Sequence, residues 1–97
     1  MTIYTITVGE KNKEFGIGVS RCVGYLFDLN DAIHAVLFNQ ADIFEHFYTL
    51  AVIEEVEEGL YSVPRKEWWY EWSYDTNKCK LIDKPEQAKN SCSFGIG

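Results

Sequence analysis

Apolar and polar residues alternate along the first part of the chain, which is the pattern of half-buried β-strands. In Thr2–Val8, Tyr4, Ile6 and Val8 alternate with threonines, and these residue types favour strands. A polar, turn-like stretch follows at Gly9–Glu14, and Val19–Phe27 is the next run rich in strand formers. The pattern predicts two strands joined by a turn.

A later stretch, Glu67–Tyr74, holds all three tryptophans of the chain. Because the side chains of a strand point alternately to two faces, one face of this stretch is an aromatic ladder. The ladder consists of Trp68, Tyr70, Trp72 and Tyr74, and the other face consists of Glu67, Trp69, Glu71 and Ser73. Asp75–Lys78 is polar and turn-like, so Cys79–Asp83 is predicted to return as the hairpin partner.

An amphipathic helix is predicted from Leu29 to about Phe38. Its apolar stripe has helical spacing and consists of Leu29, Ala32, Ile33, Val36 and Leu37. Asp28 directly precedes the helix and is a good N-cap. His34 lies away from the stripe, so we expect its side chain on the solvated surface.

Tyr48–Val56 is apolar on both faces, which predicts a central strand with one face under the helix. The acidic run at its end is expected to be solvated, and it consists of Glu54, Glu55, Glu57 and Glu58. The preceding stretch, Ala41–Phe47, fits either a helical turn or a loop that Ile43, Phe44 and Phe47 pack down.

The C-terminal part is predicted to contain one helical turn, from Pro85 to about Lys89. The tail Ser93–Gly97 has little charge and ends in apolar residues, so it should dock rather than stay in water. It can add along a sheet edge of its own domain or of a second copy, which leaves monomer and homodimer as alternatives.

Together these elements predict an α+β fold: an antiparallel sheet of four to five strands with one main helix packed on one face. A chain of 97 residues makes a single domain, residues 1–97. The opposite face of the sheet is then solvated, covered by the tail, or covered by another protomer.

Three blocks of the sequence together resemble a known family. They are Tyr48-x-x-Ala51-Val52-Ile53-Glu54-Glu55-Val56, Glu67-Trp68-Trp69-Tyr70-x-Trp72 and Phe94-Gly95-Ile96-Gly97. The family consists of small uncharacterised proteins of anaerobic gut-type bacteria and their bacteriophages. The resemblance implies a compact α+β domain and a mobile-element origin, where small acidic inhibitors of host defence are common. It implies no catalytic residue.

The formal net charge of −6 makes the chain repel phosphate backbones, so non-specific nucleic-acid binding is not expected. We expect no signal peptide and no membrane-spanning segment, and therefore a cytoplasmic protein. The three cysteines are widely spaced without a C-x-x-C pair, which favours neither a disulfide framework nor a zinc site. No cofactor or metal is expected.

Catalytic signatures are missing from the sequence. His46 stands beside Glu45, but one such dipeptide is weak evidence of chemistry, and no serine lies in a G-x-S-x-G elbow. Cys22 and Cys79 lie inside predicted strands, so we expect buried structural thiols. These observations favour a non-catalytic protein.

The aromatic ladder has two interpretations. It packs under the helix as part of a small core, which we favour, or it forms a stacking platform for a base or sugar. Trp69, on the polar face between two glutamates, is predicted to be an exposed contact residue. The remaining candidate binding residues are acidic: Glu67, Glu71, Glu55 and Glu57.

These features give two functional hypotheses. The leading one is a small acidic non-catalytic binding protein whose partner is another protein, with a host-defence component as one candidate. The alternative is a module that binds a small ligand, such as a nucleotide or signalling molecule, on an aromatic platform.

Overall fold

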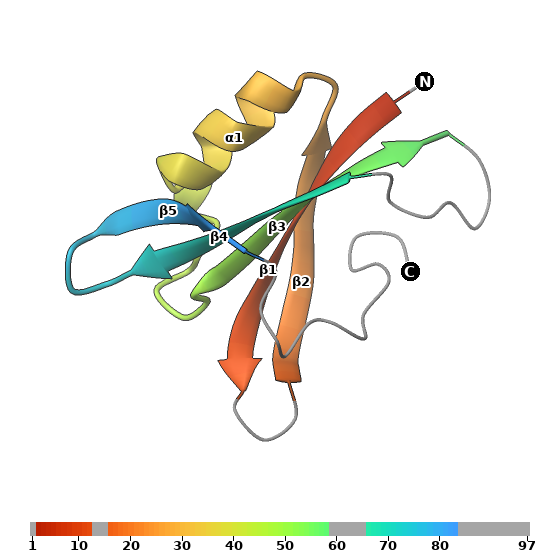
Figure 1. Ribbon diagram of the computed structural model, residues 1–97. Helices are drawn as coiled ribbons and strands as arrows, with labels where there is room; N and C mark the ends of the chain where they lie inside the picture. The colour runs from red at the N-terminus through yellow and green to blue at the C-terminus, as the bar shows by residue number, and fades with distance from the viewer. Residues whose placement is uncertain (1, 13–15, 59–65, 84–97) are drawn as a thin grey trace.

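The computed structural model describes residues 2–12, 16–58 and 66–83, which form one antiparallel sheet with a helix packed against it (Figure 1). The elements in chain order are β1 (Thr2–Asn12), β2 (Gly16–Leu26), α1 (Leu29–Leu37), the short 3₁₀ helix η1 (Gln40–Asp42), β3 (Leu50–Glu57), β4 (Lys66–Ser73) and β5 (Lys78–Ile82). The fold is α+β, as the sequence predicts.

The strand order in the sheet is β2-β1-β3-β4-β5, and every neighbouring pair is antiparallel. β3 therefore lies at the centre, which confirms the prediction from its apolar run. The hairpin predicted from the polar turn after the tryptophans is also present, because β4 pairs with β5 from Trp69 opposite Ile82 to Ser73 opposite Lys78.

The hairpin of β1 and β2 is longer than the sequence pattern predicts. Gly9 pairs with Ser20, and pairing continues to Asn12 opposite Gly16, although Gly9–Asn12 reads as a polar turn. Strand pairing here depends on backbone hydrogen bonds, which polar side chains do not prevent. The pattern of hydrophobic residues therefore places the turn several residues too early.

α1 lies against one face of the sheet, and its start is capped as predicted (Figure 1). The Asp28 carboxylate accepts hydrogen bonds from the backbone N–H groups of Asn30 at 2.7 Å and Asp31 at 3.2 Å. The residues of α1 that become buried are small, namely Ala32, Ala35 and Val36. Small side chains allow the helix backbone to approach the sheet closely, and His34 on the outer face is exposed.

The aromatic ladder of β4 faces α1 and belongs to the main core. Tyr70 is 4% exposed, and Trp68 and Trp72 pack against the same cluster, which also contains Ile53 and Val36. Three of the four ladder residues, Trp68, Tyr70 and Trp72, thus pack in the core, as the favoured interpretation predicts. Burying rings of this size supplies much of the hydrophobic stabilisation available to a small domain.

The opposite face of the sheet is also buried at its centre. The strand register aligns Thr7, Val52 and Trp69 in one row across β1, β3 and β4, and their exposed fractions are 2%, 2% and 4%. The prediction that Trp69 is an exposed contact residue is therefore wrong. Its neighbours along β4 are glutamates, but its neighbours across the strands, Val52 and Ile82, are apolar and pack against it.

Burial of this row also excludes a fully solvated second face. The tail Ser93–Gly97, one of the covers predicted for it, lies outside the described residues, as does the helical turn predicted from Pro85 to Lys89.

The expectation of a solvated acidic run fails at its first residue, because Glu54 is only 1% exposed. β3 continues to Glu57, so Glu54 is still inside the sheet between β1 and β4.

The buried stripe of α1 gives a direct test of the fold. We expect Val36→Asp to destabilise the domain by about 3–5 kcal/mol, because Val36 is fully buried in an apolar cluster where a carboxylate is poorly solvated. Asn30→Asp adds the same charge at an exposed position of α1 and should melt like the wild type. Thermal unfolding followed by circular dichroism makes the comparison; equal melting of the two variants would contradict the packing of α1.

Candidate functional site

The predicted binding residues do not come together in one site. Glu67, Trp69 and Glu71 lie on the face away from α1, where the Trp69 Nε1–H donates to the Glu67 carboxylate at 2.9 Å. Glu55 and Glu57 point to the other face by strand alternation. They accept hydrogen bonds from two residues of β1, the Tyr4 and Thr2 hydroxyl groups. The predicted binding residues are thus divided between the two faces of the sheet, and a different part of the chain has the features of a site.

The segment Asn39–Phe47, which we call the connecting loop, joins α1 to β3 and has an unusual backbone. Six non-glycine residues in the described part of the chain have positive φ, and all but Asn77 lie in this loop. They are Asn39 (47°), Ala41 (55°), Asp42 (53°), Glu45 (52°) and His46 (55°). Left-handed backbone costs an L-residue about 1–2 kcal/mol, with Asn and Asp the most tolerant. Such strain persists only where surrounding contacts impose it.

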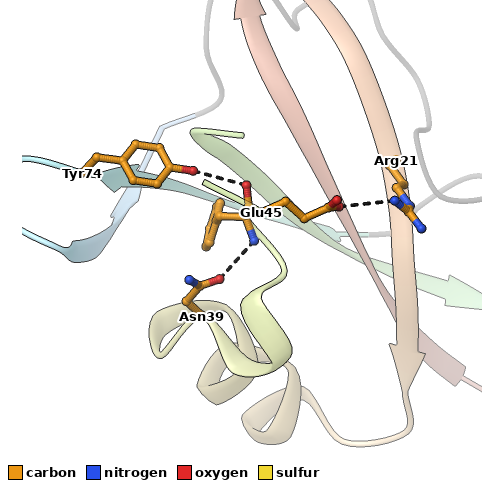
Figure 2. A network of polar contacts seen from close by, with 5 residues as sticks. Arg21, Asn39, Glu45 and Tyr74 are labelled. Atoms are coloured by element: carbon orange, nitrogen blue, oxygen red, sulfur yellow. Dashed lines mark hydrogen bonds and ion pairs between the residues drawn. The ribbon is translucent and has the colours of Figure 1, made fainter. Parts of the chain in front are cut away.

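Two hydrogen bonds of the Asn39 side chain hold the start of the loop, and Figure 2 shows the one to the Phe44 backbone. Its Oδ1 accepts from the Phe44 backbone N–H at 3.0 Å, and its Nδ2 donates to the Asp42 carboxylate at 3.2 Å. The loop backbone adds short-range bonds, including those from the N–H groups of Phe47 and Tyr48 to the Phe44 carbonyl at 3.0 and 2.8 Å. The loop is thus a compact, internally bonded unit.

Tyr74, which follows β4, fastens the end of the loop to the sheet (Figure 2). Its hydroxyl donates to the Tyr48 carbonyl at 2.7 Å, and the Phe44 carbonyl lies at 3.2 Å. Burial, together with the nearby Asp42 carboxylate, raises the pKa of the Tyr74 phenol. The phenol therefore stays protonated through the neutral range and keeps its donor.

Phe44 anchors the middle of the loop in the core. Its side chain is fully buried and stacks on Trp72 with ring centroids 5.4 Å apart and an interplanar angle of 23°. Of the residues predicted to pack the loop down, Phe44 does so, and Ile43 packs against the core at partial burial. Phe47 is 54% exposed, so its predicted role is wrong.

A groove lies between the connecting loop and β2, with a volume of about 440 Å³. The β2 wall consists of Arg21, Cys22 and Val23, and the loop wall consists of Ala41, Asp42, Ile43 and Glu45. Arg21 and Glu45 reach across it and form an ion pair at 3.4 Å, with side chains 64% and 43% exposed (Figure 2). A volume of this size is typical of binding clefts.

The exposure of the two described cysteines corrects one sequence prediction and supports the other only in part. Cys22 is exposed at the groove and is therefore not a buried structural thiol. Cys79 on β5 is half-buried, and burial raises the pKa of its thiol to about 11. Cys79 is thus the inert thiol of the pair.

The two edges of the sheet differ in length and charge. β5 has five residues, and two of them, Lys78 and Lys80, are exposed lysines that discourage pairing with another strand. β2 has 11 residues, and no described strand pairs with its outer side. Between Ser20 and Leu26 its single charged residue is Arg21. The outer side of β2 is therefore the less protected edge.

Two exposed aromatic residues extend the surface at the end of β2. Tyr25 and Phe27 are 60% and 63% exposed, and their rings meet edge to face with centroids 5.8 Å apart. Exposed aromatic side chains of this kind are common anchors in protein interfaces. Residues 20–27 thus contribute the outer edge of β2, one wall of the groove and the aromatic pair.

The histidines do not line the groove. His34 packs against Phe38 at the end of α1, and His46 stacks on Tyr74 with ring centroids 6.1 Å apart. Among the residues that the structure describes, no three His, Cys, Asp or Glu side chains are grouped so that they could hold a metal ion.

Comparison with protein-family models, with curated proteins and with solved structures finds no match to this chain. No helix in the described ranges is long and apolar enough to cross a membrane.

Sequence reasoning missed both walls of the groove. The left-handed residues include no glycine to mark them, although Asn39, Asp42 and His46 belong to types that are enriched in this conformation. The one usable signal was the ambiguity of Ala41–Phe47, which fits neither helical nor strand periodicity. That no described strand pairs with the outer side of β2 follows from the strand order, which local patterns do not specify.

The strain at Ala41 can be tested by substitution. We expect Ala41→Gly to stabilise the protein by about 0.5–1 kcal/mol, because glycine adopts positive φ without a Cβ clash but loses more entropy on folding. Ala35→Gly in the middle of α1 is the matched control and should cost about 1 kcal/mol. Denaturant unfolding measures both; a destabilised Ala41→Gly would show that the loop is not strained there.

Thiol labelling tests the described exposure of Cys22 and Cys79, which lie on the two edge strands of the sheet. At neutral pH we expect an alkylating reagent to modify Cys22 much faster than Cys79, since the thiolate is the reactive form. Labelling of Cys79 should rise as the pH approaches about 11, the pKa of its thiol. Peptide mapping by mass spectrometry follows each site, with denatured protein as the control. Equal rates in the folded protein at neutral pH would contradict the described burial.

Proposed function

We propose that this protein is a small non-catalytic binding protein that engages another protein by strand addition along the outer edge of β2. In strand addition, an extended segment of the partner hydrogen-bonds to an open sheet edge, and pockets beside the edge select its side chains. The observation that carries the proposal is the difference between the two edges, because β5 is short and lysine-bearing whereas β2 is long and nearly uncharged.

The groove and the aromatic pair flank the β2 edge on its two faces, because Tyr25 pairs with Thr5 and so points away from α1. The groove runs beside Arg21, Cys22 and Val23, so side chains of an added strand would have a place to bind. Tyr25 and Phe27 lie at the end of the same strand and offer apolar contact area. The resemblance to small bacterial and bacteriophage proteins adds a host-defence component as one class of partner.

The alternative of a small ligand held on an aromatic platform has less support. Tyr70 and Trp69 are buried on the two faces of the sheet, so their rings offer no open face for stacking. Trp72 is occupied by Phe44. The groove has the volume for a small molecule, but its described walls present no aromatic ring.

Proline substitutions in β2 test strand addition. Adjacent residues of a strand direct their N–H groups to opposite sides, so one of Ser20→Pro and Arg21→Pro removes an outward N–H and leaves the pairing with β1 intact. Thermal melting identifies that variant as the more stable of the two. We expect it to lose binding to a protein that the wild type captures from bacterial lysate, measured again with the purified partner by calorimetry.

Alanine at the same position is the matched control, because it removes the side chain and keeps the N–H group. It should bind like the wild type. Equal binding of the proline and alanine variants would contradict strand addition at β2, and the absence of any saturable protein partner would contradict the proposed function as a whole.

A further inference from the structure

The charge of the molecule is distributed unevenly around the groove. The whole chain has a net charge of −6, yet from Gly16 to Phe27 it contains no aspartate or glutamate. The loop wall of the groove, in contrast, carries the carboxylates of Asp42 and Glu45. A segment bound along β2 would therefore lie beside no acidic residue of β2 itself. It would meet the carboxylates of Asp42 and Glu45 at the loop wall of the groove.

The described contacts of the two carboxylates leave them able to bind a cation. Asp42 accepts one hydrogen bond from the neutral Asn39 amide. Glu45 pairs with Arg21, but both side chains are substantially exposed, and such pairs are worth only about 0–1 kcal/mol. With Arg21 counted, the groove still has one more negative than positive side chain.

An added strand would present its side chains to this wall in alternation. Successive side chains of a strand point to opposite faces, so every second residue of the segment lies on the α1 side, where Arg21 and Val23 line the groove. Lysine and arginine have long stems that can extend over Val23 and Ile43 while their charged ends reach the carboxylates.

We infer that the partner segment is basic, and that a lysine or arginine on the side of the added strand facing α1 binds Asp42 and Glu45 across the groove. This inference rests on the proposed strand addition at β2. The acidic charge of the whole chain acts in the same direction, because it steers a positively charged partner toward the surface.

The test uses short capped peptides in which lysine and valine alternate, with a glutamate–valine peptide of equal length as the comparison. Binding is followed by the backbone amide signals of the isotope-labelled protein. We expect the lysine peptide to shift signals of Ser20–Leu26 and Ala41–Glu45, and its affinity to fall as salt screens the charges. The glutamate peptide should leave these signals unchanged.

Charge-neutralising variants then locate the contact. Asp42→Asn and Glu45→Gln should each weaken the lysine peptide by about two- to fivefold, the range for exposed ion pairs. Asp75→Asn, in the exposed turn between β4 and β5, removes the same charge away from the groove and should change nothing. An equal loss in Asp75→Asn would overturn the inference, because it would show attraction to the net charge alone.

The outcomes separate this inference from the proposed function. If both peptides shift the β2 signals equally, strand addition stands and the preference for a basic segment is refuted. If the lysine peptide shifts signals only outside β2 and the connecting loop, the inference is refuted as well, and the proline variants decide the proposed function independently.

Discussion

The stacking of Phe44 on Trp72 is the contact on which the rest of this arrangement depends. It joins the middle of the connecting loop to the aromatic ladder, at a point that the sheet and α1 already bury. Removing a buried phenylalanine side chain typically costs about 3–5 kcal/mol. Left-handed backbone at Ala41 and Glu45 costs about 1–2 kcal/mol each. The packing of Phe44 therefore offsets part of the strain that the five left-handed residues of the loop carry.

The packing of Phe44 in the core also determines the shape of the groove. Because Phe44 points into the core and Tyr74 fastens the carbonyl groups beside it, the following residue, Glu45, is turned outward toward Arg21 on β2. The same contacts that stabilise the loop thus fix the wall of the groove that lies opposite β2. Under the proposed function, a wall held in this way would need little reorganisation when a partner binds, which lowers the entropic cost of association.

Both faces of the sheet bury polar groups that have no hydrogen-bond partner among the described residues. On the α1 side this is the Trp72 Nε1–H, and on the other face these are the hydroxyl groups of Thr5 and Thr7. An unpaired buried hydroxyl costs about 1–3 kcal/mol. Val52 and Trp69 in the same region are apolar and buried, and their burial offsets this cost.

The sequence by itself determined the elements whose side chains repeat with a clear period. The stripe and the Asp28 cap predict α1, and the alternation in β4 predicts which aromatic side chains face it, because these patterns arise within one element. Only the tertiary structure decided the burial of Trp69 and Glu54, the exposure of Cys22, and the groove. Each of these depends on which residues lie across a strand or loop boundary, and cross-strand neighbours are set by the order and register of the sheet rather than by nearby residues in the chain.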